Sequence, residues 1–403
     1  MGRTDRRLFV LAVWVSLTLA TVSFVDAAAA ADRKQPYALP REPIRVGPGR
    51  AISTIGEAAQ RVVDGDTVEV DAGEYRGDTA VWLNDNLTLR AVGGRVRLVA
   101  MGMAAEGKAI WVVRGGKVSV AGFDFTGAKV PSHNGAGIRL DKGYLVVRDC
   151  SFTDNEEGIL TSNDRSAVLE IRDSEFANNG YGDGYTHDIY VGAIAHLTIT
   201  GSYLHHARSG HLLKSRAAIS HVKYNRLTDE IGGTASYELE FPNGGIAYVI
   251  GNIIQKDSQA QNPHLISFGA EGYMRPPNRL YLINNTLVDK RPQGSIFLGV
   301  RPGADSVLAV NNVLVGRGNL DSAGPGIYKN NFTVGWSEFE FAAREDYRLK
   351  ATSRLIGKAI DPGTADSEDL RPHREYVHPR STAALQQPAR NPGAVQRSAV
   401  ASN

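Results

Sequence analysis

The chain has 403 residues, and its 45 basic and 43 acidic residues leave a net charge of +2. This near-balance argues against a nucleic-acid-binding protein, whose basic residues are in clear excess and clustered. Hydrophobic residues make up 42% of the chain, which excludes wholesale disorder, and the single cysteine, Cys150, excludes an intrachain disulfide and a thiolate-rich zinc site.

The first 31 residues have the pattern of an export signal. Three arginines within the first seven residues form a basic end, residues 8–25 are an uncharged apolar run, and five alanines after Asp26 offer small-residue cleavage sites. We therefore predict a signal peptide over residues 1–31 and a secreted or periplasmic mature protein. The apolar run is also long enough to span a bilayer, so an uncleaved anchor is the alternative. No comparable run follows, and no other membrane contact is expected.

Residues 55–63 (IGEAAQRVV) predict a short amphipathic helix that leads into strands through GDTVEVDAGEY. The repeats that follow stack on one another, and the first unit of a stack exposes apolar surface and unpaired strand edges. We therefore expect this helix to cap the N-terminal end of the stack.

From about residue 87 one phrase recurs, in which alternating apolar residues are followed by a turn-forming pair and a large apolar residue. The third residues of the eight copies between 118 and 314 are 23 to 33 residues apart. Five positions later the same apolar column recurs in every copy. Its members are Phe125, Phe152, Phe176, Leu204, Leu227, Ile254, Leu287 and Leu314.

A repeat of this length indicates a solenoid, in which each unit stacks on its neighbours. The units alternate with period two and carry β-branched residues, and most of them are too short for a strand, a crossover helix and a second strand. The chain is therefore predicted to coil as a parallel β-helix. In the later units Asn225, Asn252, Asn285 and Asn312 share one position, which predicts a ladder of stacked side-chain amides.

Three segments carry a resemblance to a known family: IGEAAQRVVDGDTVEVDAGEY (55–75), the repeated strand–Asn–apolar phrase, and DYRLKATSRLIGKAID (346–361). Together they resemble the pectate-lyase-like superfamily of secreted carbohydrate-active proteins. Over residues 43–362 the resemblance implies an all-β, single-stranded, right-handed parallel β-helix. It does not fix the chemistry, because that superfamily includes lyases, hydrolases, epimerases, esterases and phage or adhesin domains. Residues 363–403 are expected to form a partly disordered C-terminal tail.

A second strand recurs between the repeated phrases, at residues 187–192, 211–216, 237–242 and 264–269. Its equivalent apolar residues step by one coil length and should point inward. Those residues are Ile189, Leu213, Leu239 and Ile266. Alternation then places a set of polar residues outward on one face. That set is Asp188, Tyr190, Lys214, Arg216, Glu238, Glu240 and Ser267, and Arg139, in an earlier coil, is expected to lie outside it.

This face has the composition that β-elimination from an acidic polysaccharide requires. The carboxylate beside the proton to be removed must be neutralised, which Lys214 or Arg216 could do. A general base must take the proton, and the candidates are Lys214, Tyr190 and His211. We therefore predict a polysaccharide lyase. The catalytic candidates are Lys214, Arg216, Tyr190, His211, Glu238 and Glu240, and the substrate-binding candidates are Asp188, His187, Tyr185, Asn243, His264 and Glu271.

Two alternatives to a lyase stay open. An inverting glycoside hydrolase would use Glu238 and Glu240, which stand about 6.6 Å apart along an ideal strand, as its paired carboxyls. A non-catalytic polysaccharide-binding or surface protein would use the solenoid only as a scaffold, with cross-strand pairs such as Lys214–Glu240 as ordinary surface ion pairs. In each case the expected partner is a polysaccharide and not a nucleic acid, and the expected state is a monomer.

The histidines His187, His211 and His264 share a column with Tyr237, which favours a packed stack over a metal site. No cofactor is required, but clustered carboxylates could bind Ca²⁺, and the candidates are Asp183, Asp188, Glu238 and Glu240. Two glycine-rich loops, 178–188 and 240–245, either wall a groove or simply connect strands. In the first case Tyr181, Tyr185 and Pro242 could stack on sugar rings.

Overall fold

The computed structural model describes residues 41–320 and 326–396. The predicted signal peptide lies outside this part of the chain. The described residues form a right-handed parallel β-helix with very little helix, the all-β fold that the repeats and the family resemblance predicted. No helix in the described ranges has both the length and the apolar character of a membrane-spanning segment.

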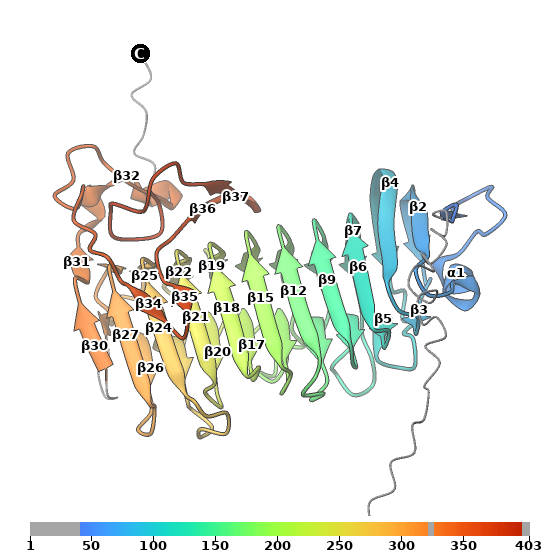
Figure 1. The fold of residues 1–403 in the computed structure, drawn as a ribbon, viewed down its shortest axis with the longest axis horizontal. Coiled ribbons are helices and arrows are strands. Elements are labelled where there is room, and N and C mark those ends of the chain that lie inside the picture. The colour runs from blue at the N-terminus through green and yellow to red at the C-terminus, as the bar shows by residue number, and fades with distance from the viewer. Residues whose placement is uncertain (1–40, 321–325, 397–403) are drawn as a thin grey trace, which may run out of the picture. The chain divides into compact units, whose positions relative to one another are not determined.

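The strands of the coils form three faces, and every pairing between successive coils is parallel (Figure 1). The first face consists of β6 (Lys117–Ala121), β9 (Tyr144–Arg148), β12 (Val168–Arg172), β15 (His196–Thr200), β18 (Ile219–Lys223), β21 (Ile246–Ile250), β24 (Arg279–Ile283), β27 (Ser306–Val310) and β30 (Gly326–Lys329). The second consists of β7 (Phe123–Thr126), β10 (Ser151–Thr153), β13 (Glu175–Ala177), β16 (Tyr203–His205), β19 (Arg226–Thr228), β22 (Ile253–Lys256), β25 (Thr286–Asp289), β28 (Val313–Val315) and β31 (Phe332–Val334).

The third face is a ten-stranded parallel sheet. Its strands are β3 (Ala80–Trp82), β5 (Ala109–Val113), β8 (Ala136–Leu140), β11 (Glu157–Thr161), β14 (Ile189–Val191), β17 (Leu213–Ser215), β20 (Leu239–Phe241), β23 (His264–Phe268), β26 (Ile296–Val300) and β29 (Asn319–Leu320). At the N-terminal end the short β1 (Ile44–Val46) pairs with β2 (Thr67–Arg76). The long strands β2 and β4 (Leu87–Val99) pair along their length, so that β4 joins the first two faces through β6 and β7.

The apolar column predicted from the repeats fills the interior of the coils. Its residues pair in register from coil to coil, and nearly all of them are fully buried. The rings of Phe125, Phe152 and Phe176 stack almost parallel, with centroids 4.9 and 4.7 Å apart. Because equivalent residues always meet, a repeated apolar position in the sequence becomes a continuous core.

The asparagine ladder is confirmed, and it lies between the first and second faces. The side-chain amide of Asn225 donates to Oδ1 of Asn252 at 3.0 Å, and the same bond recurs from Asn252 to Asn285 and from Asn285 to Asn312. Asn331 adds one further member, accepting from Asn312 at 2.9 Å. All four predicted asparagines are fully buried, so the ladder satisfies polar groups that would otherwise destabilise the interior.

The predicted helix corresponds to α1 (Ile55–Arg61), which begins after Thr54, whose hydroxyl accepts the backbone N–H of Glu57. Its residues Ile55 and Ala58 are buried in the core of the coils. The Asp78 carboxylate accepts the first two helical N–H groups, at 2.6 and 2.9 Å. The helix therefore forms where the sequence indicates, while its role as a cap stays a prediction.

The coils end at β31, before the predicted boundary at residue 362. The chain continues through the 3₁₀ helices η1 (Trp336–Glu338) and η2 (Ala342–Arg344) and three antiparallel hairpins, the first of which is buried against the second face. These hairpins are β32 (Phe339–Phe341) with β33 (Asp346–Leu349), β34 (Thr364–Ala365) with β35 (Glu368–Asp369), and β36 (Arg374–Val377) with β37 (Ser381–Ala384).

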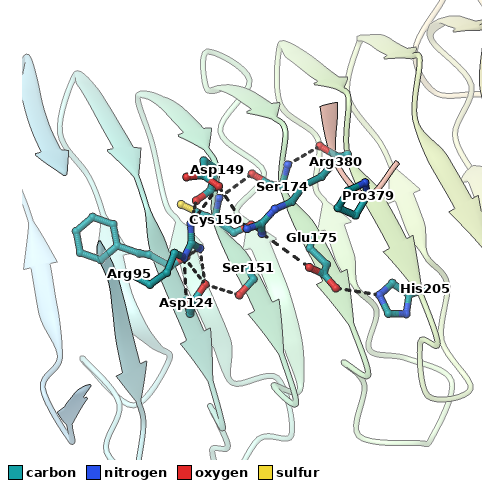
Figure 2. A network of polar contacts seen from close by, with 12 residues as sticks. Arg95, Asp124, Asp149, Cys150, Ser151, Ser174, Glu175, His205, Pro379 and Arg380 are labelled. Atoms are coloured by element: carbon teal, nitrogen blue, oxygen red, sulfur yellow. Dashed lines mark hydrogen bonds and ion pairs between the residues drawn. The ribbon is translucent and has the colours of Figure 1, made fainter. Parts of the chain in front are cut away.

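Residues 363–396, the described part of the expected C-terminal tail, pack on the coils. Leu370 is fully buried, and the N–H of His373 donates to the hydroxyl of Tyr224 at 3.0 Å. Figure 2 shows Arg380 reaching the coils, where its guanidinium lies 3.4 Å from Asp149 and 3.8 Å from Glu175. Specific polar contacts hold this segment in place, a feature that its Pro- and Ala-rich composition did not indicate.

The ladder yields a stability prediction. Replacing Asn252 with Ala should lower the free energy of unfolding by about 2 to 4 kcal/mol, because it removes the four hydrogen bonds of the side-chain amide and leaves buried partners on both neighbouring coils unsatisfied. Chemical denaturation followed by circular dichroism measures the change. The exposed Asn319→Ala is the control and should change stability by less than about 0.5 kcal/mol. An equal loss of stability in both variants would contradict a stabilising role of the asparagine ladder.

Candidate functional site

The predicted register of the third face is confirmed. Ile189 pairs with Leu213, Leu213 with Leu239, and Leu239 with Ile266, and all four side chains are buried. The residues that follow them therefore also form a column. That column is Tyr190, Lys214, Glu240 and Ser267, and the register extends it backward to Leu160 and Arg139.

A groove of about 860 Å³ runs along this face. Its floor contains Arg139, Leu160, Tyr190 and Lys214, and the loop around residues 183–187 forms part of its wall. Arg216 and Glu271 line the same groove. The loop that the sequence offered as a groove wall therefore does border one.

Lys214, Arg216 and Tyr190 form a contact network in this groove. Arg216 Nε donates to the Tyr190 hydroxyl at 3.0 Å, and Arg216 Nη1 donates to Oδ1 of Asn243. Lys214 Nζ lies 3.2 Å from Glu240 Oε2 and 2.9 Å from Glu271 Oε1. The structure thus brings together two cations and a phenol from adjacent coils, as the alternation predicted.

The two carboxylates beside Lys214 have different surroundings. Hydrogen bonding to Arg216, with a further contribution from Lys214, lowers the pKa of Glu271 to about 2. For Glu240, burial acts in the opposite direction, but the contacts with His211 and Lys214 keep the pKa below its ordinary value. Both carboxylates are therefore ionised at neutral pH, and both compensate the cations of the groove.

The histidine column is a packed stack. The rings of His187 and His211 lie 4.4 Å apart at an interplanar angle of 20°, and His187 also stacks on Tyr190. Burial lowers the pKa of His211, whose Nε2 lies 3.1 Å from Glu240 Oε2. His211 is thus beneath the groove, where it positions Glu240, and the structure does not place it as the base that the sequence suggested.

Two predicted outward residues, Asp188 and Glu238, point into the core. Asp188 is fully buried and accepts the side-chain amide of Asn179 at 2.8 Å. Glu238 is fully buried beside Lys256, with Nζ and Oε1 3.0 Å apart. The physical reason is local, because β14 begins at Ile189 and β20 at Leu239, so the preceding residues lie at a bend where strand alternation does not apply.

Burial raises the pKa of Asp188 well above its ordinary value and that of Glu238 to about 8. More importantly, neither carboxyl reaches the groove. Glu238 lies in the core beside Lys256, whereas Glu240 lies beside His211 and Lys214, so the two carboxyls cannot flank a glycosidic bond together. The geometry therefore does not support an inverting glycoside hydrolase that uses Glu238 and Glu240 as its paired carboxyls.

The remaining predicted binding residues are spread over different environments. Tyr185 is 81% exposed at the rim of the groove, while Asn243 is buried and holds Arg216. His264 contacts Asn262, 3.3 Å from its Oδ1, and does not line the groove. Tyr181 stacks on His133, with ring centroids 3.9 Å apart. Only part of the predicted binding set therefore faces a common space.

Two residues that line the groove were not predicted as site residues. Arg139 was expected to lie outside the charged set, but it lines the groove and pairs with Asp141. Glu157 is a buried carboxyl that also lines the groove and accepts the N–H of His187 at 3.0 Å. Burial raises its pKa well above the ordinary value. Extending the register one coil backward, so that 157–161 aligns with 187–191, would have found Glu157.

The carboxylates proposed for Ca²⁺ do not converge. Asp188 and Glu238 have separate partners in the core, Glu240 contacts His211 and Lys214, and Asp183 is in the exposed loop. Within residues 41–320 and 326–396 no group of three or more His, Cys, Asp or Glu side chains has an arrangement that could hold a metal ion.

Comparison with known proteins bears on the fold. No protein-family model matches the chain, and no curated protein matches it. The crystal structure of pectate lyase Pel9A is similar, with a TM-score of 0.55 and 12% sequence identity, over 82% of this chain and 96% of that chain. At this identity the similarity shows the fold alone. The chain thus has a pectate-lyase-like β-helix fold, in agreement with the resemblance seen in its sequence.

The inward position of Glu238 generates a prediction. Glu238→Ala should destabilise the protein by about 3 to 5 kcal/mol, because it removes the carboxyl partner of the buried Lys256 ammonium and leaves a cavity in the core. The measurement is the unfolding midpoint and slope in urea.

The double variant Glu238→Leu, Lys256→Met is the matched control. It replaces both buried polar groups with apolar ones of similar volume and should recover most of the lost stability. A Glu238→Ala protein of normal stability would show that the carboxyl is not a structural partner of Lys256.

Proposed function

We propose that this protein is an exported polysaccharide lyase that cleaves an acidic polysaccharide by β-elimination. The observation that carries the proposal is the contact of Arg216 with Tyr190, 3.0 Å apart, beside Lys214 in a groove along the coils. The pectate-lyase-like fold is a scaffold on which such chemistry occurs, and it supports the proposal without fixing it.

In the proposed reaction Lys214 and Arg216 contact the carboxylate of a uronate residue. Two positive charges lower the cost of the negative charge that develops when the adjacent C5–H bond breaks. The electron pair of that bond forms the C4=C5 double bond, and the C4–O bond to the neighbouring sugar breaks. The products are an unsaturated uronate end and a new hydroxyl end.

Tyr190 is the proposed base. Its oxygen accepts the N–H of Arg216, so the guanidinium both fixes the ring and stabilises a phenolate when it forms. Lys214 contacts two carboxylates, which suits a neutralising role better than a basic one. Glu157, a carboxyl whose burial favours the protonated form, is the proposed donor to the leaving oxygen.

Export completes the proposal, since a polymer too large to enter the cell requires an enzyme outside it. The basic and apolar pattern of residues 1–31 supports this location. The expected partner remains the polysaccharide itself.

Non-catalytic binding of an acidic polysaccharide is the second candidate. It is favoured by the pairing of Lys214 and Arg216 with Glu271, since such a surface can exchange one carboxylate for another without any bond breaking.

A panel of acidic and neutral polysaccharides tests these candidates on the purified mature protein. An unsaturated-uronate absorbance identifies a lyase, and new reducing ends without that absorbance identify a hydrolase. Retention of a polymer without either signal identifies a binding protein and would overturn the catalytic proposal.

The proposed roles predict the activity of variants, measured with the polysaccharide whose cleavage produces the unsaturated-uronate absorbance. Tyr190→Phe, Lys214→Ala and Arg216→Ala should each lower kcat/KM by at least about 100-fold, the usual effect of removing a group that stabilises developing charge or transfers the proton. Circular dichroism and the unfolding midpoint should stay close to those of the wild type.

Arg172→Ala is the control, because Arg172 is an exposed strand arginine on the first face that pairs with Glu170. It should leave kcat/KM within about twofold of the wild type. A comparable loss in Arg172→Ala would mean that activity does not depend on this groove.

A further inference from the structure

The two cations of the proposed site already hold a carboxylate of the protein. Glu271 Oε2 lies 2.6 Å from Arg216 Nη1, and Oε1 accepts from Arg216 Nη2 and from Lys214 Nζ, both at 2.9 Å. A carboxylate across the two outer nitrogens of a guanidinium, with an ammonium on one oxygen, is how proteins commonly recognise carboxylate ligands. The contact therefore has the geometry expected for a bound uronate.

Glu271 reaches this position from a loop that follows β23, two coils beyond Lys214 on β17. The loop turns at Gly269 and Gly272, both with positive φ, and the Glu271 N–H donates to the Pro242 carbonyl at 2.9 Å. Asn243 Nδ2 donates to the Gly272 carbonyl at 3.1 Å. Backbone contacts thus direct the carboxylate back over the intervening coil.

The two carboxylates on Lys214 differ in access. The Glu240 side chain is 4% exposed and is fixed from below by His211, whereas the Glu271 side chain is 44% exposed. An incoming ligand can therefore replace Glu271 but not Glu240. Because Glu271 is charged, a ligand that replaces it must bring a negative charge of its own or leave both cations undercompensated.

We propose that Glu271 is an internal substitute for the carboxylate of an anionic sugar: it fills the Lys214–Arg216 site in the free protein and is displaced when such a sugar binds. This inference rests on the ligand class of the proposed function, and not on its reaction. It makes Glu271 a specificity-determining residue, since neutral sugars cannot compete for the cations that it covers.

A different role would give the same contacts. Glu271 could hold Arg216 against Tyr190 as a positioning residue, and its removal would then weaken the site. The two roles predict opposite changes in ligand affinity, so a binding measurement separates them.

The test uses the mature full-length chain and isothermal titration calorimetry. Glu271→Gln keeps the size of the side chain and removes its charge. The probes are trigalacturonate and trimannuronate, each with its fully methyl-esterified form as a neutral counterpart of the same shape. We expect at least one acidic trisaccharide to bind Glu271→Gln about tenfold more tightly than the wild type, and the esters to show no such gain.

The control is Glu74→Gln. Glu74 also bridges two cations, with Arg97 3.2 Å away and Arg76 in contact, and its side chain is 36% exposed. It lies on β2, away from the groove, so this substitution should change the affinity for neither acid nor ester.

Unchanged or weaker binding of both acids by Glu271→Gln overturns the inference, as does an equal gain for acids and esters. Absence of acid binding to both proteins overturns it as well. Turnover is measured separately. A gain in affinity for the acidic trisaccharide without cleavage of any polymer supports this inference and rejects the lyase. Cleavage of a polymer without that gain rejects this inference and supports the lyase.

Discussion

Backbone hydrogen bonds between successive coils hold each residue about 4.8 Å from its equivalent in the next coil. Every other feature of the protein depends on that spacing. Inside, it turns one repeated phenylalanine position into the stacked rings of Phe125, Phe152 and Phe176. Outside, it makes neighbours of Tyr190 and Lys214, which are far apart in the chain. A core and a charged groove thus arise from the same register.

The same spacing lets the interior hold polar groups. The asparagine ladder, Asp188 beside Asn179 and Glu238 beside Lys256 each find a partner one coil or one bend away. Buried polar groups without such partners would be costly. Polar residues at and beside the third-face strands therefore fall into two sets, one buried in the core and one that faces the groove, and residue type does not distinguish them.

Charge compensation dominates the groove. Arg139 pairs with Asp141, and Lys214 and Arg216 share Glu271, so the free protein presents few uncompensated charges there. In the proposed function, binding of an acidic polymer is an exchange of one carboxylate for another, in which the cost of desolvation is small because the cations always have a carboxylate partner. Such an exchange discriminates acidic from neutral sugars, but it does not produce a high affinity for the acidic ones.

The coils and the strand columns could be predicted from the sequence, because strand alternation and repeat length are local properties that parallel pairing converts directly into neighbours. The sequence also identified Tyr190, Lys214 and Arg216 as one face. The direction of the side chains beyond the strand ends could not be predicted in this way. Bends turn Asp188 and Glu238 inward, and the loop after β23 directs Glu271 back over the one intervening coil to Lys214, since the direction of a bend or loop depends on packing against other coils and not on local periodicity.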